Sequence, residues 1–149
     1  MIELDLEHFI NTGTLGPFDK SSTRAQIERL LGAPDPGGYP GFAIYGNLAF
    51  DLCDSDGPPC RIQIGFPHQN WMKWDEWPNA RFNWKLGRFN APVIIDEALT
   101  ILTGFHEEDV ESSNETLRIF TNSNTNIDLM FEFDAEHDAV ILSNITAHP

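Results

Sequence analysis

Three aspartates, Asp51, Asp54 and Asp56, precede Gly57 in a pattern similar to the start of a calcium-binding loop. An EF-hand loop needs oxygen ligands at fixed positions, an acidic residue at its twelfth position and a helix on each side. The spacing does not fit, and the flanking residues alternate as strands do. We therefore interpret the segment as a polar hairpin turn and expect no metal site.

Cys53 and Cys60 lie at the two ends of this turn, where they could face each other. An oxidising compartment would favour a disulfide, but the acidic N-terminus lacks the pattern of a secretion signal, so we expect reduced, partly buried thiols. The pair has no nearby histidine and is a poor zinc site. We expect no cofactor.

The histidines, at positions 8, 68, 106, 137 and 148, stand in no recognised catalytic frame. The chain has no nucleophile elbow, no phosphate-binding glycine loop and no zinc-protease motif. Carboxylates are abundant, but nothing in the sequence marks two of them as a buried acid–base pair. We expect a protein that is not an enzyme.

The chain carries 9 basic and 23 acidic residues, for a net charge of -14. Such a charge repels nucleic acids and anionic membranes and attracts basic proteins. No apolar stretch approaches the roughly 20 residues of a membrane span. We expect a cytoplasmic protein that binds neither nucleic acid nor membrane.

The acidic residues concentrate at the C-terminal end of the chain. Residues 92–149 contain twelve acids and one base, Arg118, for a net charge of -11. Concentrated charge of one sign speeds association with a partner of the opposite sign, so we predict contact residues here. The predicted acidic contacts are Glu107, Glu108, Asp109, Glu111, Asp134, Glu136 and Asp138.

All four tryptophans lie between positions 71 and 84. Trp84 alternates with polar residues in a predicted strand over 80–86, which favours a core position. Trp74 and Trp77 stand among charged residues, and we predict that one of them is an apolar anchor for a partner. The structural alternative, that all four are core residues, stays open.

Two units with the same order of elements flank this tryptophan-rich segment, 68–89. In the first, Thr23 and Gln26 predict a capping box for a helix that ends at Gly32, followed by strands over 42–45, 48–52 and 62–66. In the second, a helix from Pro92 to Gly104 precedes strands over 117–120, 127–133 and 139–142. Leu4, Leu6, Phe9 and Ile10 predict a further short helix that ends near Gly13.

We therefore predict an α+β fold with antiparallel sheet, in one sheet or two, of six or seven strands and two or three helices on one face. We expect residues 1–149 to form a single domain. The repeated order suggests an αβββ duplication with half-repeats 15–67 and 90–146, although two unrelated meanders would give the same order.

Several short strings carry a resemblance to a known class of protein. They are Leu15-Gly16-Pro17-Phe18, Ser22-Thr23, Ile27-Glu28-Arg29-Leu30-Leu31-Gly32-Ala33-Pro34-Asp35, Ile44-Tyr45-Gly46-Asn47-Leu48 and Phe50. Over residues 13–66 the pattern resembles bacterial immunity proteins that are encoded beside polymorphic toxins. The resemblance implies a monomeric protein that inhibits a cognate, basic toxin by covering its active site, with no chemistry of its own.

Two alternatives to an immunity protein stay open. An acidic secretion chaperone has a similar size and charge, but it dimerises and holds an effector segment in apolar grooves. A small-ligand-binding protein or an enzyme would need a deep pocket with convergent polar groups, for example near residues 71–84.

Overall fold

The computed structural model describes residues 2–36, 41–52, 57–66, 82–89, 92–108, 117–136 and 138–148. The elements in chain order are β1 (Ile2–Asp5), α1 (Leu6–Thr12), α2 (Arg24–Leu31), β2 (Phe42–Tyr45), β3 (Leu48–Asp51), β4 (Arg61–Gly65), β5 (Phe82–Lys85), the 3-10 helix η2 (Gly87–Phe89), α3 (Ile95–Ile101), β6 (His106–Glu108), β7 (Arg118–Asn122), β8 (Ile127–Asp134) and β9 (Ala139–Ala147). The α+β class predicted from the sequence is confirmed.

Within the described residues, seven strands form one antiparallel sheet in the order β2-β3-β4-β9-β8-β7-β6. The two meanders therefore join through their last strands, and Ile64 of β4 pairs with Ile145 of β9 at the centre. From this centre the first meander runs to one edge of the sheet and the second runs to the other. Each meander thus occupies its own half of the sheet.

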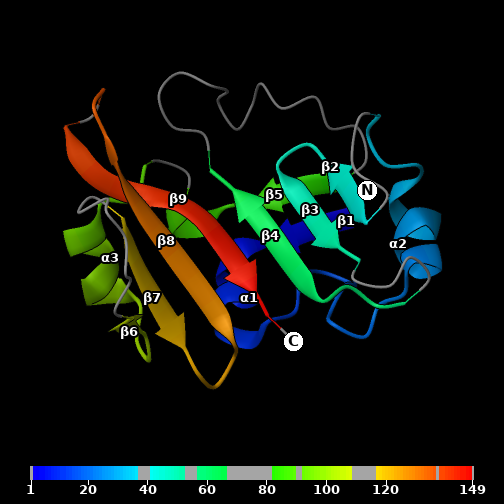
Figure 1. The fold of residues 1–149 in the computed structure, drawn as a ribbon, viewed down its shortest axis with the longest axis horizontal. Helices are drawn as coiled ribbons and strands as arrows, with labels where there is room; N and C mark the ends of the chain where they lie inside the picture. The colour runs from blue at the N-terminus through cyan, green and yellow to red at the C-terminus, as the bar shows by residue number, and fades with distance from the viewer. Residues whose placement is uncertain are drawn as a thin grey trace.

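Alternation along the strands gives the sheet one buried face. A continuous cross-strand row of buried side chains consists of Tyr45, Leu48, Ile64, Ile145, Leu129 and Phe120. Every member is at most 4 % exposed, and burying an aliphatic or aromatic side chain contributes about 1.5–3 kcal/mol. In Figure 1, α1, β1 and β5 lie behind the sheet, with α2 and α3 towards its two ends.

Helix α2 begins and ends where the sequence predicts. The Thr23 hydroxyl accepts from the Gln26 amide at 3.3 Å, and the Gln26 side chain accepts from the Thr23 amide at 2.9 Å, so the capping box is present. The helix ends at Gly32, whose φ of 79° lies in the left-handed region that favours glycine. The Tyr45 hydroxyl donates to the Gly32 carbonyl at 2.9 Å and fixes the helix to β2.

The N-terminal segment differs from the single helix predicted for it. Leu4 lies in β1, which pairs in parallel with β5, and only Leu6–Thr12 is helical, ending at Gly13 as predicted. The pairing aligns Leu4 with Trp84, and this long-range contact overrides the helical spacing of the apolar residues. β1 and β5 form a second, two-stranded sheet. Phe82 is buried and Trp84 is partly buried, so the predicted alternation in this strand is confirmed.

Helix α3 begins later than Pro92. It starts at Ile95 after an Ile94 N-cap that makes no side-chain hydrogen bond. The preceding residues are extended along β9 instead, because the Leu142 amide donates to the Val93 carbonyl at 2.9 Å and Ile94 forms a β-bridge with Ile141.

The expectation of reduced cysteines is wrong, because Cys60 is disulfide-bonded. The one other cysteine in the sequence, Cys53, lies outside the described residues. Of the aspartates compared above with a calcium loop, Asp51 is a β3 residue that pairs with Arg61 at 2.6 Å, and Asp54 and Asp56 lie outside the described residues.

Candidate functional site

Negative charge is concentrated in one half of the large sheet. We call the described residues from 92 to 148, which form α3 and β6–β9, the acidic module. The module contains nine carboxylates and one base, Arg118, for a net charge of -8. The carboxylates are Asp96, Glu97, Glu107, Glu108, Asp128, Glu132, Asp134, Glu136 and Asp138.

The remaining described residues, from 2 to 89, are almost neutral. They contain seven carboxylates and six bases, for a net charge of -1. Many of these charges are paired: Arg24 with Glu28 at 3.2 Å, Arg61 with Asp51 at 2.6 Å and Lys85 with Asp5 at 2.9 Å. The charge imbalance of the sequence is therefore also an imbalance in space.

We call the described residues from 2 to 89 the near-neutral half. Many of its charges are neutralised in pairs, and Lys85 is an example. The His8 backbone amide, and then the Lys85 ammonium, hold the pKa of Asp5 below its ordinary value. In turn, the hydrogen bond with the Asp5 carboxylate raises the pKa of Lys85. Both groups therefore stay charged at neutral pH, and each screens the other from an approaching partner.

Glu107 lies on β6, a strand of three exposed residues at one edge of the sheet. No strand was predicted here from the sequence, and charged residues of this kind have little strand propensity. Arg118 of β7 donates from Nε and Nη2 to the two Glu107 carboxylate oxygens at 2.8 and 2.9 Å. These hydrogen bonds lower the pKa of Glu107 and neutralise its charge locally.

Glu108 is exposed at the same edge. Its carboxylate lies 3.1 Å from the Nε2 atom of His106 on the same strand. Further along this half of the sheet, Asp128 of β8 lies 2.6 Å from Nε2 of His148. Charged residues on a short edge strand discourage pairing with other chains, which is a structural role that Glu107 and Glu108 share.

Three predicted contact residues lie in the turn between β8 and β9, and the structure separates them. Glu136 and Asp138 are exposed. Asp134 is 1 % exposed, and its carboxylate accepts a hydrogen bond from the Glu136 amide at 2.9 Å. The prediction of Asp134 as a contact residue is corrected: its side chain holds the turn that presents the other two.

The remaining predicted contacts lie outside the described residues. They are Asp109, Glu111, Trp74 and Trp77.

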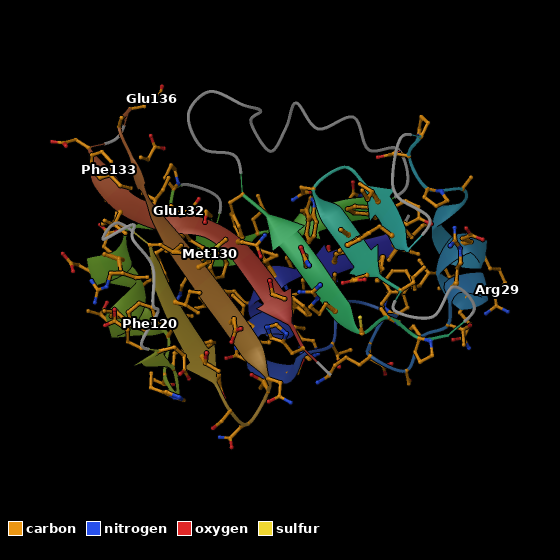
Figure 2. The ribbon with its side chains drawn as sticks, in the orientation of Figure 1. Arg29, Phe120, Met130, Glu132, Phe133 and Glu136 are labelled. Atoms are coloured by element: carbon orange, nitrogen blue, oxygen red, sulfur yellow. The ribbon has the colours of Figure 1, made fainter. Side chains whose placement is uncertain are left out.

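Phe133 is a surface residue that the sequence analysis missed. It continues the alternation of Leu129 and Phe131, which are 1 % exposed, yet it is 42 % exposed itself. Figure 2 shows Phe133, Glu132 and Glu136 near the end of the β8–β9 hairpin, at the opposite end of the molecule from Arg29. The signal in the sequence was its position, one residue before the acidic turn begins.

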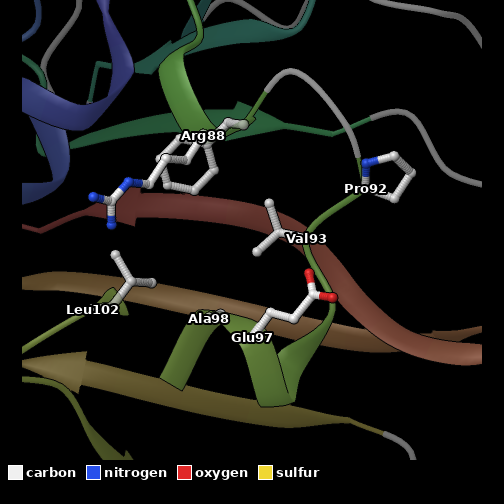
Figure 3. Close-up of a pocket in the computed structure, with 7 residues that line it drawn as sticks. Arg88, Pro92, Val93, Glu97, Ala98 and Leu102 are labelled. Carbon is white, nitrogen blue, oxygen red and sulfur yellow. The ribbon is translucent and has the colours of Figure 1, made fainter. Parts of the chain in front are cut away.

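A small pocket lies between η2 and α3 (Figure 3). Its volume is about 120 Å³, and its lining includes Phe89, Val93, Ala98 and Leu102, with Arg88 and Glu97. Sites for small organic ligands usually measure about 300–1,000 Å³. This pocket is too small for such a ligand.

Comparisons with protein-family models, with curated proteins and with solved structures found no match to this chain. Within the described ranges, no helix has the length and hydrophobicity needed to cross a membrane, and no group of three potential ligand side chains could hold a metal ion.

Proposed function

We propose that this protein is an immunity protein that binds a basic bacterial toxin and neutralises it by covering its active site. The observation that carries the proposal is the contrast in charge between the acidic module, at -8, and the remaining described residues, at -1. A dipolar arrangement of this kind orients the protein towards a cationic partner before contact and raises the association rate.

Covering a toxin's active site needs only part of the surface. The protein exposes 8389 Å², and a standard interface takes about 800 Å² from each partner, roughly a tenth of that surface. The exposed carboxylates of α3, β6 and the β8–β9 turn, all in the acidic module, would contribute to such a patch. Occlusion requires no catalytic group in the inhibitor.

In this role the protein acts as a monomer, and the location expected from the sequence is the cytoplasm. The Cys60 disulfide weighs against that location, because cytoplasmic thiols are kept reduced. A toxin that acts in an oxidising compartment would need its inhibitor there. Trapping thiols with an alkylating reagent in living cells, before lysis, decides the compartment: alkylated Cys60 supports the cytoplasm, and protected Cys60 contradicts it.

The function is tested with the toxin domain encoded by the gene beside that of this chain, purified with its active site inactivated. Titration calorimetry at low salt is expected to show tight one-to-one binding that weakens as salt is added, because exposed charges are screened. No binding at low salt, or no toxin gene beside this one, contradicts the proposal. A stable dimer of this chain with no affinity for the toxin supports the secretion chaperone instead.

A further inference from the structure

The β8–β9 hairpin extends beyond the strands on both sides of it. Within the described residues, β7 pairs with β8 only as far as Phe131. On the other side, β4 pairs with β9 only from Asn144 to Ala147, and the Phe66 amide extends this contact to the Ser143 carbonyl. Figure 1 shows the end of the hairpin reaching past the rest of the sheet.

The projecting part has a fixed base. Ile94 forms a bridge with Ile141, and the Leu142 amide donates to the Val93 carbonyl. Beyond these contacts, Phe133 pairs with Val140 and Asp134 pairs with Ala139. We call residues 132–136 and 138–140 the hairpin end.

Two features support the conformation of the hairpin end. The register shifts between Met130 and Phe131, and the Ser143 hydroxyl donates to the Met130 carbonyl at 3.1 Å across this irregularity. Bulges of this kind bend and twist a strand and so aim its end. At the turn, the buried Asp134 carboxylate holds the Glu136 amide. A preorganised element loses less conformational entropy on binding than a flexible loop does.

Phe133 gives this element an apolar contact surface. Phe133 alternates with the buried residues Leu129 and Phe131 of β8, but it lies beyond the last residue of β8 that pairs with β7. Its side chain is therefore 42 % exposed. Exposed acids, Glu136 and Asp138, follow it in the turn. An aromatic residue with a charged surround is the arrangement typical of the energetic centre and rim of a protein interface.

We propose that the hairpin end is the element that enters the toxin, with Phe133 in an apolar pocket and the turn acids against a cationic rim. This inference rests on the proposed function and deepens it. A projecting ribbon is complementary to a concave surface, and enzyme active sites are concave. A second copy of this chain fits less well, because its net charge of -14 repels the turn acids.

The test compares Phe133→Ala with Leu30→Ala in binding to the same inactivated toxin domain. Leu30 lies on α2 and is 41 % exposed, so the two changes remove similar exposed apolar groups from opposite halves. Phe133→Ala is expected to weaken binding by at least about tenfold, as for an interface hot spot. Leu30→Ala is expected to leave the affinity unchanged.

A second pair of variants tests the turn acids. Glu136→Gln with Asp138→Asn removes two charges from the hairpin end, and asparagine tolerates the left-handed φ of 46° at position 138. Glu3→Gln with Glu28→Gln removes two charges from the near-neutral half. Only the hairpin pair is expected to slow association, by several-fold at low salt.

The outcomes separate the two proposals. If the wild-type protein binds and the hairpin variants bind equally well, the hairpin inference is overturned and the proposed function stands. If the wild-type protein does not bind, both are overturned. If Phe133→Ala instead converts a dimer of this chain to a monomer, the hairpin end is a self-association surface and the inference is wrong.

Discussion

Arg118 and Glu107 form a two-bonded ion pair between β7 and β6, with nitrogen-to-oxygen distances of 2.8 and 2.9 Å. Arg118 is the one base in residues 92–149. The Arg118 guanidinium also lies 5.5 Å from the centre of the Phe120 ring. Phe120 is the β7 residue that lies opposite Glu107 in the sheet. The single base of the acidic module thus adds a side-chain link between β7 and the edge strand β6, which also pair through their backbones.

This ion pair predicts a pH dependence of stability. Arg118 lowers the pKa of Glu107 below its ordinary value of 4.5. The stabilisation is therefore present at neutral pH and is lost as the pH falls below 4.5 through the lowered pKa. Both side chains are more than a third exposed, so solvent limits the coupling to about 0.5 kcal/mol.

A double-mutant cycle measures that coupling. Glu107→Gln, Arg118→Gln and the double variant are unfolded with urea at neutral and at acidic pH. We expect a stabilising coupling energy between Glu107 and Arg118 at neutral pH that disappears at acidic pH, where Glu107 is protonated. A coupling that is the same at both pH values shows that the carboxylate charge plays no part.

Asp134→Ala is expected to destabilise the protein by about 1–3 kcal/mol, because it leaves a backbone amide without its buried acceptor. Hydrogen exchange at the Glu136 amide should accelerate more than the global change in stability explains. Asp138→Asn is the control, since Asp138 is exposed and asparagine accepts its backbone conformation. Equal stability of Asp134→Ala and the wild type would show that Asp134 does not support the turn.

Cys60→Ser is expected to lower the free energy of unfolding. The sequence offers Cys53 as the partner, and a disulfide that closes a loop of about eight residues contributes about 2.5 kcal/mol by chain entropy. Mass spectrometry of the unreduced protein should show the loss of two hydrogen atoms relative to the reduced form. Two thiols that react with Ellman's reagent in the folded, unreduced protein would disprove the bond.

The separation of charge can be tested without the toxin. A short oligolysine peptide, titrated into isotopically labelled protein at low salt, should shift the amide resonances of α3 and β6–β9. Resonances of α2, β2 and β3 should move little, because their half of the sheet is nearly neutral. Shifts spread evenly over both halves would contradict the charge separation.

The sequence predicted the elements whose signals are local. Thr23 and Gln26 mark the start of α2, and the alternation of Leu48 and Phe50 marks β3. The parallel pairing of β1 with β5 was missed, since it joins residues about eighty positions apart and no local pattern reports it. β6 was missed because its residues are charged and it depends on β7 for its hydrogen bonds.

The charge of the candidate site was predictable, but the roles of its residues were not. Counting acids locates the acidic module, yet it cannot distinguish the buried Asp134 from the exposed Glu136 two residues later. Burial depends on how far the neighbouring strands extend. The extent of the neighbouring strand also explains Phe133. Its alternation with Leu129 and Phe131 predicts a core position, but the pairing with β7 ends at Phe131 and leaves Phe133 exposed.

The most direct measurement is inhibition of the active toxin by this protein across a series of salt concentrations, from roughly 0.05 M to 0.5 M. We predict stoichiometric inhibition at low salt and an inhibition constant that rises steeply with salt. The salt dependence should become weaker when Glu136 and Asp138 are neutralised and stay unchanged when Glu3 and Glu28 are. A toxin that stays fully active with excess protein at low salt would contradict the account.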